Sequence, residues 1–254
     1  MNRKIHLIMT MAGEGSRFKD AGIDMPKPLI DLNGEPLFKH AMSTVSGIDI
    51  ASMTFVVRKE HIDKYDIDKK IFNIYPQAYI IPVEKTTRGA ADTAFLAVRS
   101  LILNDVADFD DSVVIMDCDV AVESYEWRHD IQNPDCDGIL LSFKSKDPKY
   151  SYATEKDSEV ISTSEKIVIS EHALTSPYFI SNIEDFIDAF HDMESFKSND
   201  GLTYKEMYMS ILYNFLIANR KKIRLIDVDS ITSFGTPEEL ENLKKTRSEL
   251  TITK

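Results

Sequence analysis

Short apolar runs alternate with helical patterns along this 254-residue chain, and this alternation limits the folds that it can adopt. The apolar runs lie at residues 5–9, 53–57, 79–83, 113–116, 139–143 and 223–228. Residues 37–45, 90–101 and 204–218 instead carry apolar side chains at three- and four-residue steps, the spacing of a helix with one buried face. This order predicts a doubly wound α/β fold, in which helices cover both faces of a mostly parallel sheet.

The composition indicates one acidic domain. Thirty lysine and arginine residues against 42 aspartate and glutamate residues leave a formal charge of −12. Nucleic acids and anionic membranes bind to basic surfaces, so we expect neither as a partner. Any phosphate site must therefore be a local basic pocket, and the acidic surface is compatible with a monomer or a homodimer.

The cysteine content and the absence of long apolar stretches bear on the compartment. Cys118 and Cys136 are the two cysteines of the sequence, and neither a secretory leader nor an apolar run near 18 residues is present. These features predict a cytoplasmic location, no disulfide and no membrane span.

A glycine-rich loop follows the first apolar run. Gly13 and Gly15 allow a tight turn with exposed backbone N–H groups, which suits the binding of phosphate oxygens. Arg17 and Lys27 add positive charge near this loop, and prolines on either side of Lys27 restrict its backbone. The motif alone also fits a rigid surface turn with a solvated lysine.

Two common phosphate-binding motifs do not fit this loop. The dinucleotide-binding fingerprint requires a third glycine where this chain has Phe18, and the spacing to a P-loop lysine also fails. A neutral glycine loop beside two cations instead favours a nucleoside triphosphate.

Three segments carry a family resemblance: MAGEGSR at 11–17, PKPLI at 26–30 and GEPL at 34–37. They resemble the signature of the nucleotidyltransferase family that activates sugar phosphates and related metabolites. The chain is most similar to the compact capsule and cell-surface branch, which includes phosphocholine and phosphoglutamine cytidylyltransferases. The resemblance implies a Rossmann-like sheet of the nucleotide-diphospho-sugar transferase type. It also implies one domain spanning residues 1–254, with an acceptor-binding excursion around 144–182.

The resemblance also implies a set of site residues. Arg17 would contact the triphosphate and Lys27 would lie between the reacting phosphates, so both are the expected catalytic residues. The acceptor would contact Glu165, Lys166 and Tyr152, with Lys166 on its phosphate, although an exposed Glu–Lys pair is more often plain surface. The nucleotide would contact Met11, Ala12, Gly13, Glu14, Gly15, Ser16, Thr87, Arg88, Gly89 and Ala90.

Aspartates that follow two of the apolar runs are the predicted Mg²⁺ ligands. Carboxylates at the end of the run 113–116 would hold Mg²⁺ against phosphate oxygens. The resemblance implies that Asp119 is the metal ligand, and Asp117 ranks second. Relatives commonly carry a further metal aspartate where this chain has Ser233, and Asp229 or Asp227 is the candidate substitute. Without the resemblance, an aspartate after a strand is as often a turn residue.

Together these residues predict a Mg²⁺-dependent nucleotidylyltransferase that releases pyrophosphate. It would transfer CMP from CTP to phosphoglutamine, phosphocholine or a sugar phosphate, in capsule or surface polysaccharide biosynthesis. Two alternatives remain open. The Asp117-Cys118-Asp119 motif also fits a nucleotide-sugar glycosyltransferase, and Ser233 motivates a non-catalytic nucleotide-binding regulator.

Three further segments receive structural interpretations. Residues 105–111 contain four aspartates and predict a solvated loop, and the polar residues 144–165 predict an excursion from the core sheet. Thr236 and Glu239 have the spacing of a capping box, which predicts the start of a helix there.

Overall fold

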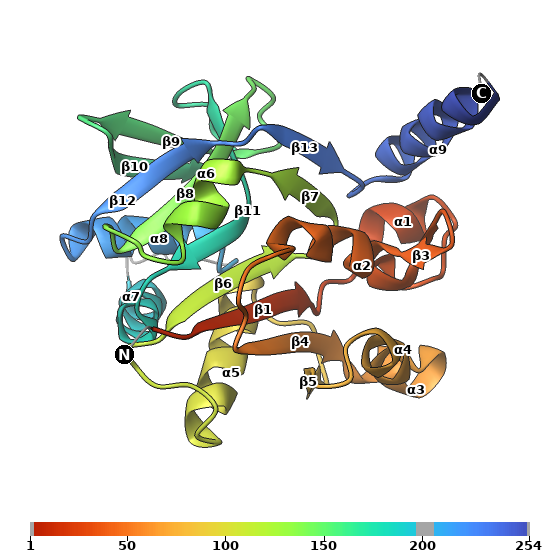
Figure 1. The fold of residues 1–254 in the computed structure, drawn as a ribbon, viewed down its shortest axis with the longest axis horizontal. Coiled ribbons are helices and arrows are strands. Elements are labelled where there is room, and N and C mark those ends of the chain that lie inside the picture. Colours follow the sequence, from red (N-terminus) through yellow and green to blue (C-terminus); the bar gives the residue numbers. More distant parts are fainter. Residues whose placement is uncertain (1–2, 197–205, 253–254) are drawn as a thin grey trace.

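The computed structural model describes residues 3–196 and 206–252, with side chains as far as residue 245. A mixed sheet forms the centre of the molecule (Figure 1). Its strands are β1 Ile5–Met11, β4 Ser52–Arg58, β5 Tyr79–Val83, β6 Ser112–Asp117, β8 Gly138–Lys144, β9 Ser151–Lys156, β10 Glu159–Glu165, β11 His172–Ile180 and β12 Ile223–Asp227. Short ladders pair β2 Asp31–Leu32 with β3 Glu35–Pro36, and β7 Val120–Glu123 with β13 Ser230–Ser233.

The strand order places the carboxyl ends of several strands at one edge. The order is β10-β9-β11-β6-β1-β4-β5, with β8 also paired to β11, and β12 paired to β8. Strands β6, β1, β4 and β5 are parallel, whereas β11 is antiparallel to both β6 and β8. Because ligands bind at the carboxyl ends of such strands, this topology positions a site beyond β1 and β6.

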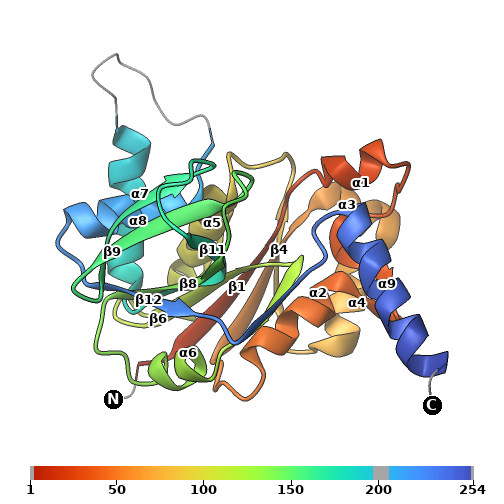
Figure 2. The ribbon, with the colours of Figure 1, turned by 90° about the horizontal axis from the view of Figure 1, so that it is seen from above.

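Helices cover both faces of the sheet (Figure 2). They are α1 Ser16–Asp20, α2 Leu37–Ala41, α3 Lys59–Tyr65, α4 Ile67–Ile74, α5 Ala90–Leu103, α6 Tyr125–Asp130, α7 Ile183–Ser195, α8 Met209–Ala218 and α9 Pro237–Ile252, with 3-10 helices at Lys27–Leu29 and Met42–Val45. Side chains alternate between the two faces along β1. Leu7 and Met9 pack in one core with α2 and α4, and Ile8 packs in the other with α5, α7 and α8. The predicted doubly wound α/β class is therefore confirmed.

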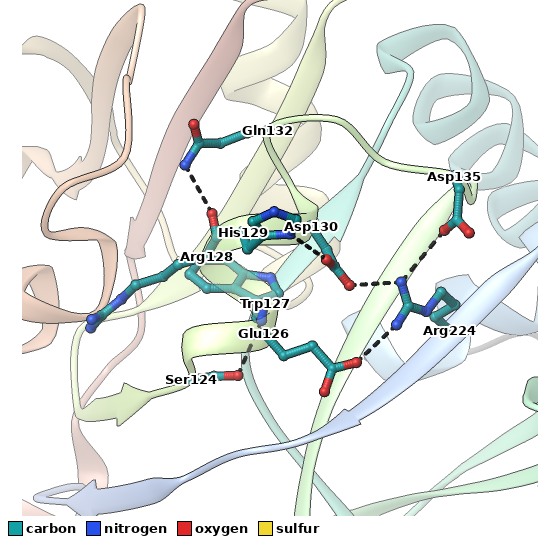
Figure 3. Close-up of polar contacts among 9 residues, drawn as sticks. All are labelled: Ser124, Glu126, Trp127, Arg128, His129, Asp130, Gln132, Asp135 and Arg224. Atoms are coloured by element: carbon teal, nitrogen blue, oxygen red, sulfur yellow. Dashed lines mark hydrogen bonds and ion pairs between the residues drawn. The ribbon is translucent and has the colours of Figure 1, made fainter.

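Helix α6 is fastened to the sheet by Arg224 of β12 (Figure 3). The Arg224 guanidinium donates to Asp130 at 2.7 Å and to Glu126 at 2.9 Å, which are both on α6. Trp127 lies between these two residues in sequence and is fully buried in the first core. These ion pairs and the buried Trp127 side chain hold α6 against the sheet.

Two interpretations of polar segments need correction. Most of residues 144–165 belong to the sheet, because β9 and β10 extend it by antiparallel pairing, and only residues 145–150 and the turn at 157–158 leave it. The segment 105–111 is a loop, but Asp111 is buried rather than solvated, since it accepts hydrogen bonds from the Lys4 backbone N–H and from His6. Composition alone does not show which polar side chains are buried, because burial depends on hydrogen-bond partners that the fold supplies.

Two remaining predictions concern helix and membrane segments. The helical pattern at 204–218 corresponds to α8, which begins at Met209, and residues 204–205 lie outside the described residues. Within the described part of the chain, no helix has the length and apolar character needed to cross a membrane.

Candidate active site

A cavity of about 690 Å³ opens at the carboxyl ends of β1 and β6. The predicted nucleotide residues Met11, Ala12, Gly13, Glu14, Gly15, Thr87, Arg88, Gly89 and Ala90 all line it, together with Lys27, Asp117 and Asp119. Ser16 instead lines an adjoining hollow with Arg17. Glu206 also lines this cavity, so the structure brings residues from five separate stretches of sequence together.

The glycine loop turns at Gly15. This residue has φ +65° and so adopts the left-handed conformation that glycine favours, directly before α1. A Cβ on Gly15 would lie 3.5 Å from the Lys27 Cβ, so the loop and the lysine segment are in contact. Gly13 has open space around its Cβ position, which leaves room beside the loop backbone.

Lys27 forms an ion pair with Asp119 across the cavity. Its backbone lies in the short 3-10 helix at Lys27–Leu29, and its Nζ donates a hydrogen bond to Asp119 Oδ2. Burial lowers the pKa of Lys27, but the Asp119 carboxylate, with Asp117 nearby, outweighs that effect and raises the pKa above its ordinary value. The ammonium is therefore charged, and the lysine lies beside the glycine loop.

Asp117 ends β6 beside Asp119. Burial, with a further contribution from the Asp119 charge, raises the pKa of Asp117 to about 6. The Thr10 hydroxyl donates a hydrogen bond to the Asp117 carboxylate at 3.3 Å. The Asp117 backbone N–H donates to Ser176 Oγ at 2.8 Å. Ser176 lies where the pairing of β11 with β8 shifts register, and such bulges redirect side chains beside functional sites.

The paired carboxylates fit Mg²⁺. A divalent cation would offset the negative charge of two neighbouring carboxylates, and Mg²⁺ often uses one or two carboxylates together with substrate phosphates. Within the described side chains, no group of three or more His, Cys, Asp or Glu residues is arranged to hold a metal by itself. Asp117 and Asp119 are therefore suited to a metal that the substrate also binds.

Asp229 does not join these carboxylates, so this part of the prediction is corrected. Its carboxylate accepts a hydrogen bond from the Tyr125 backbone N–H at 2.8 Å. The β13–β7 ladder pairs Ser233 with Val120 and Ser230 with Glu123, which places Asp229 at the end of the ladder away from Asp119. The position of Asp229 after an apolar run was misleading, because β13 runs toward the site and Asp229 precedes it at the far end of the ladder.

Gly235 lies directly beside the Asp119 carboxylate. A Cβ at this position would lie 2.6 Å from Asp119 Oδ2, closer than real Cβ atoms approach their neighbours. The absence of a side chain at Gly235 therefore determines where the Asp119 carboxylate can lie. Ser233, which lies where the resemblance implies a metal aspartate, donates its hydroxyl to Glu239 at 2.8 Å.

A second cavity of about 200 Å³ meets the first at Asp117 and Asp119. Arg17 lines this second cavity rather than the nucleotide cavity where the sequence placed it. The remaining wall carries aromatic and charged residues, which are Phe143, Lys149, Tyr150, Tyr178 and Glu239. The two cavities therefore share the Asp117 and Asp119 carboxylates, so ligands bound in each cavity would meet there.

The predicted acceptor residues lie outside this second cavity. Tyr152 is fully buried and donates its hydroxyl to the Asp147 carbonyl at 2.8 Å, so its assignment to the acceptor is corrected. Glu165 accepts hydrogen bonds from Ser151 and Ser210. Lys166 donates to the Tyr208 hydroxyl at 2.9 Å, and neither Glu165 nor Lys166 lines either cavity.

Sequence reasoning missed Lys149 and Glu239 as residues of this second cavity. Lys149 Nζ lies 3.5 Å from Glu239 Oε1 and 4.8 Å from the centre of the Tyr150 ring. Lys149 lies in the β8–β9 connection and Glu239 on α9, 90 positions apart in the sequence. The aromatic residues around Tyr150 and Tyr178 were the feature of the sequence that could have indicated this cavity. The sequence does not show that these two segments lie together, which only the fold reveals.

Comparison with known proteins gives a structural likeness along nearly the whole chain. No protein-family model matches the sequence, and no curated protein matches it. A nucleoside-diphosphate-sugar pyrophosphorylase from Vibrio cholerae RC9 superposes with a TM-score of 0.79 at 25% identity, covering 94% of this chain and 99% of that one. This confirms the predicted resemblance to the nucleotidyltransferase family.

Two further solved structures share the nucleotidyltransferase fold at lower identity. A putative glucose-1-phosphate thymidylyltransferase from Bacillus anthracis has a TM-score of 0.75 at 17% identity, covering 95% of this chain and 94% of that one. The inositol-1-phosphate CTP transferase from T. maritima has a TM-score of 0.73 at 15% identity, covering 97% of both chains. The capsule and cell-surface branch stays a prediction.

Proposed function

We propose that this protein transfers a nucleoside monophosphate from a nucleoside triphosphate to a small phosphorylated acceptor, with release of pyrophosphate. The observation that carries the proposal is the meeting of two cavities at Asp117 and Asp119, with Lys27 paired to Asp119. One cavity carries the glycine loop, and the other has a polar and aromatic wall. Two substrates would thus meet where charge can be neutralised.

The proposed mechanism needs no side-chain nucleophile. The second pKa of a phosphate monoester is near 6, so at neutral pH the acceptor already carries an ionised oxygen that can attack the α-phosphorus. The backbone N–H groups of the glycine loop would bind the triphosphate, and Lys27 would lie between the reacting phosphates. Asp119 and Asp117 would hold Mg²⁺, which would supply positive charge to offset the negative charge of the phosphates.

CTP is the proposed nucleotide, and the acceptor is a sugar phosphate, an inositol phosphate, phosphocholine or phosphoglutamine. The preference for CTP follows from the resemblance of the sequence to cytidylyltransferases, and one structural neighbour is named as a CTP transferase. The other neighbours are named for nucleoside-diphosphate sugars or glucose 1-phosphate, which supports a phosphorylated polyol or sugar as acceptor. A role in capsule or surface polysaccharide synthesis belongs to the same proposal.

Pyrophosphate release tests this function. CTP, UTP, dTTP, ATP and GTP would each be mixed with Mg²⁺ and with each acceptor in turn. We expect pyrophosphate only when the correct nucleotide and acceptor are both present. Asp119→Asn should abolish most of this release, whereas Asp229→Asn, which changes an aspartate at the far end of the β13–β7 ladder, should not.

A glycosyltransferase is the second candidate, because Asp117-Cys118-Asp119 is an Asp-x-Asp motif at a strand end. That reaction would release a nucleoside diphosphate from a nucleotide sugar and would not require Lys27. A non-catalytic regulator would bind nucleotide and release nothing. The same assay, with nucleoside diphosphate measured alongside pyrophosphate, separates the three functions.

A further inference from the structure

The segment around Met207 forms part of the wall of the nucleotide cavity. The Met207 backbone N–H donates to the Arg88 carbonyl at 2.7 Å, and the Ala91 backbone N–H donates to the Met207 carbonyl at 2.9 Å. Gly89 lies between these contacts with φ +143°, and a Cβ there would lie 2.6 Å from the Met207 carbonyl oxygen. This segment is therefore held directly against the loop at residues 87–90, which the resemblance implies contacts the nucleotide.

Glu206 extends from this segment into the nucleotide cavity. The Tyr208 hydroxyl donates to Glu206 Oε2, and Lys166 donates in turn to the Tyr208 hydroxyl at 2.9 Å. Burial and the hydrogen bond to Glu206 raise the pKa of Tyr208, so its phenol remains a protonated donor at neutral pH. These two hydrogen bonds, from Lys166 to Tyr208 and from Tyr208 to Glu206, thus orient the Glu206 carboxylate at the cavity wall.

The position of Glu206 favours contact with the base rather than with the phosphates. In the proposed function the glycine loop and Lys27 bind the phosphates, whereas Glu206 directly precedes Met207, whose backbone is hydrogen-bonded to the loop on both sides of Gly89. A carboxylate beside a triphosphate would be repelled unless a metal lay between them. A carboxylate beside a base would instead accept hydrogen bonds from the base edge.

The hydrogen-bonding edge of cytosine differs from that of uracil and thymine in how well it fits a carboxylate. Cytosine presents its N4 amino group as a donor at position 4, where uracil and thymine present a carbonyl oxygen. The N3–H of uracil is flanked by two carbonyl oxygens, which would face the carboxylate unfavourably. Resting on the proposed function, we infer that Glu206 accepts a hydrogen bond from the exocyclic amino group of cytosine and selects CTP over UTP and dTTP.

Nucleotide binding in the presence of Mg²⁺ tests this selection. CTP and UTP would be titrated separately against the wild-type chain, Glu206→Gln and Glu194→Gln. We expect the wild type to bind CTP at least about tenfold more tightly than UTP, and Glu206→Gln to bring the two affinities within about threefold. Glu194→Gln is the matched control because Glu194 pairs with Arg88 beside the same loop but lies outside the nucleotide cavity.

Tyr208→Phe provides a second variant that keeps the carboxylate and removes the hydroxyl that orients it. Because Tyr208 is a positioning residue, Tyr208→Phe should lower the CTP preference less than Glu206→Gln does, with little effect on UTP binding. A wild type that binds UTP as well as CTP would overturn the inference. So would an equal loss of CTP and UTP affinity in Glu206→Gln, which would indicate a contact to the ribose that both nucleotides share.

The outcome is separable from that of the proposed function. Pyrophosphate release from UTP or dTTP in preference to CTP would support nucleotidyl transfer and overturn the role of Glu206. A CTP preference in binding that Glu206→Gln removes, with no pyrophosphate released from any nucleotide, would support the role of Glu206 and contradict the catalytic proposal.

Discussion

At the scale of single residues, Lys27 is the side chain on which the proposed chemistry most depends. Lys27→Ala should lower the turnover number by about 100-fold or more, because a fixed charge at the reacting phosphates is lost. Lys39→Ala is the matched control, since Lys39 also pairs with a carboxylate, that of Glu35, and lies outside both substrate cavities. Steady-state rates and thermal unfolding of both variants check this. A rate for Lys27→Ala within threefold of the wild type would show that the assigned role is wrong.

Gly235 gives a second prediction at this scale. Gly235→Ala would place a Cβ 2.6 Å from the Asp119 carboxylate, so Asp119 must move away from Lys27 and from the proposed metal position. We expect a turnover loss of about tenfold or more, with a higher Mg²⁺ concentration needed for half-maximal rate. Rates measured across a Mg²⁺ series, together with thermal unfolding, check this. An unchanged Mg²⁺ requirement would contradict the contact.

At the scale of elements, the start of α9 depends on the capping box that its sequence predicted. The Glu239 backbone N–H donates to Thr236 Oγ1 at 3.2 Å, and the Thr236 backbone N–H donates to Glu239 Oε2 at 3.2 Å. Thr236→Ala should therefore lower the free energy of unfolding by about 1 kcal/mol, and Thr236→Ser should retain most of it. Urea unfolding of the three proteins gives the comparison. Equal losses in both variants would exclude the cap as the cause.

Elements with a local signal were predictable from the sequence. The apolar run at 79–83 is β5, and the helical pattern from residue 90 begins α5 at that residue. Strand β11 was missed, because Ser176 and Pro177 interrupt its apolar pattern at the register shift. The nucleotide cavity was predictable because one contiguous motif supplies much of its wall. The second cavity was not, because its residues come from the β8–β9 connection, β11 and α9.

At the scale of the whole molecule, a buried polar network connects the strands at the edge opposite the site. His6 of β1 lies between Ser52 Oγ of β4, 2.7 Å from Nδ1, and Asp111 Oδ2, 3.0 Å from Nε2. Burial raises the pKa of Asp111, but hydrogen bonds from the Asp108 backbone, from His6 and from the Lys4 backbone outweigh this and hold the pKa below its ordinary value.

This lowered pKa gives a pH dependence with a defined sign. The ionised Asp111 stabilises the folded state above its ordinary pKa of 3.8, and that stabilisation is lost as the pH falls through the lower pKa of the folded state. Asp111→Asn should cost about 1–3 kcal/mol at pH 7, and the difference from the wild type should shrink below pH 4. Urea midpoints between pH 7 and pH 3 measure this. A difference that stays constant over that range would contradict the assignment.

The central claim is that two substrates meet at Asp117, Asp119 and Lys27 and that bond formation occurs at the α-phosphorus. Phosphorus-31 nuclear magnetic resonance of a complete reaction with CTP, Mg²⁺ and the active acceptor tests it most directly. The account predicts that the signals of the triphosphate and the acceptor monoester decline together, with equal amounts of a diphosphate diester and free pyrophosphate appearing. Formation of a nucleoside diphosphate or of orthophosphate in place of pyrophosphate would contradict it.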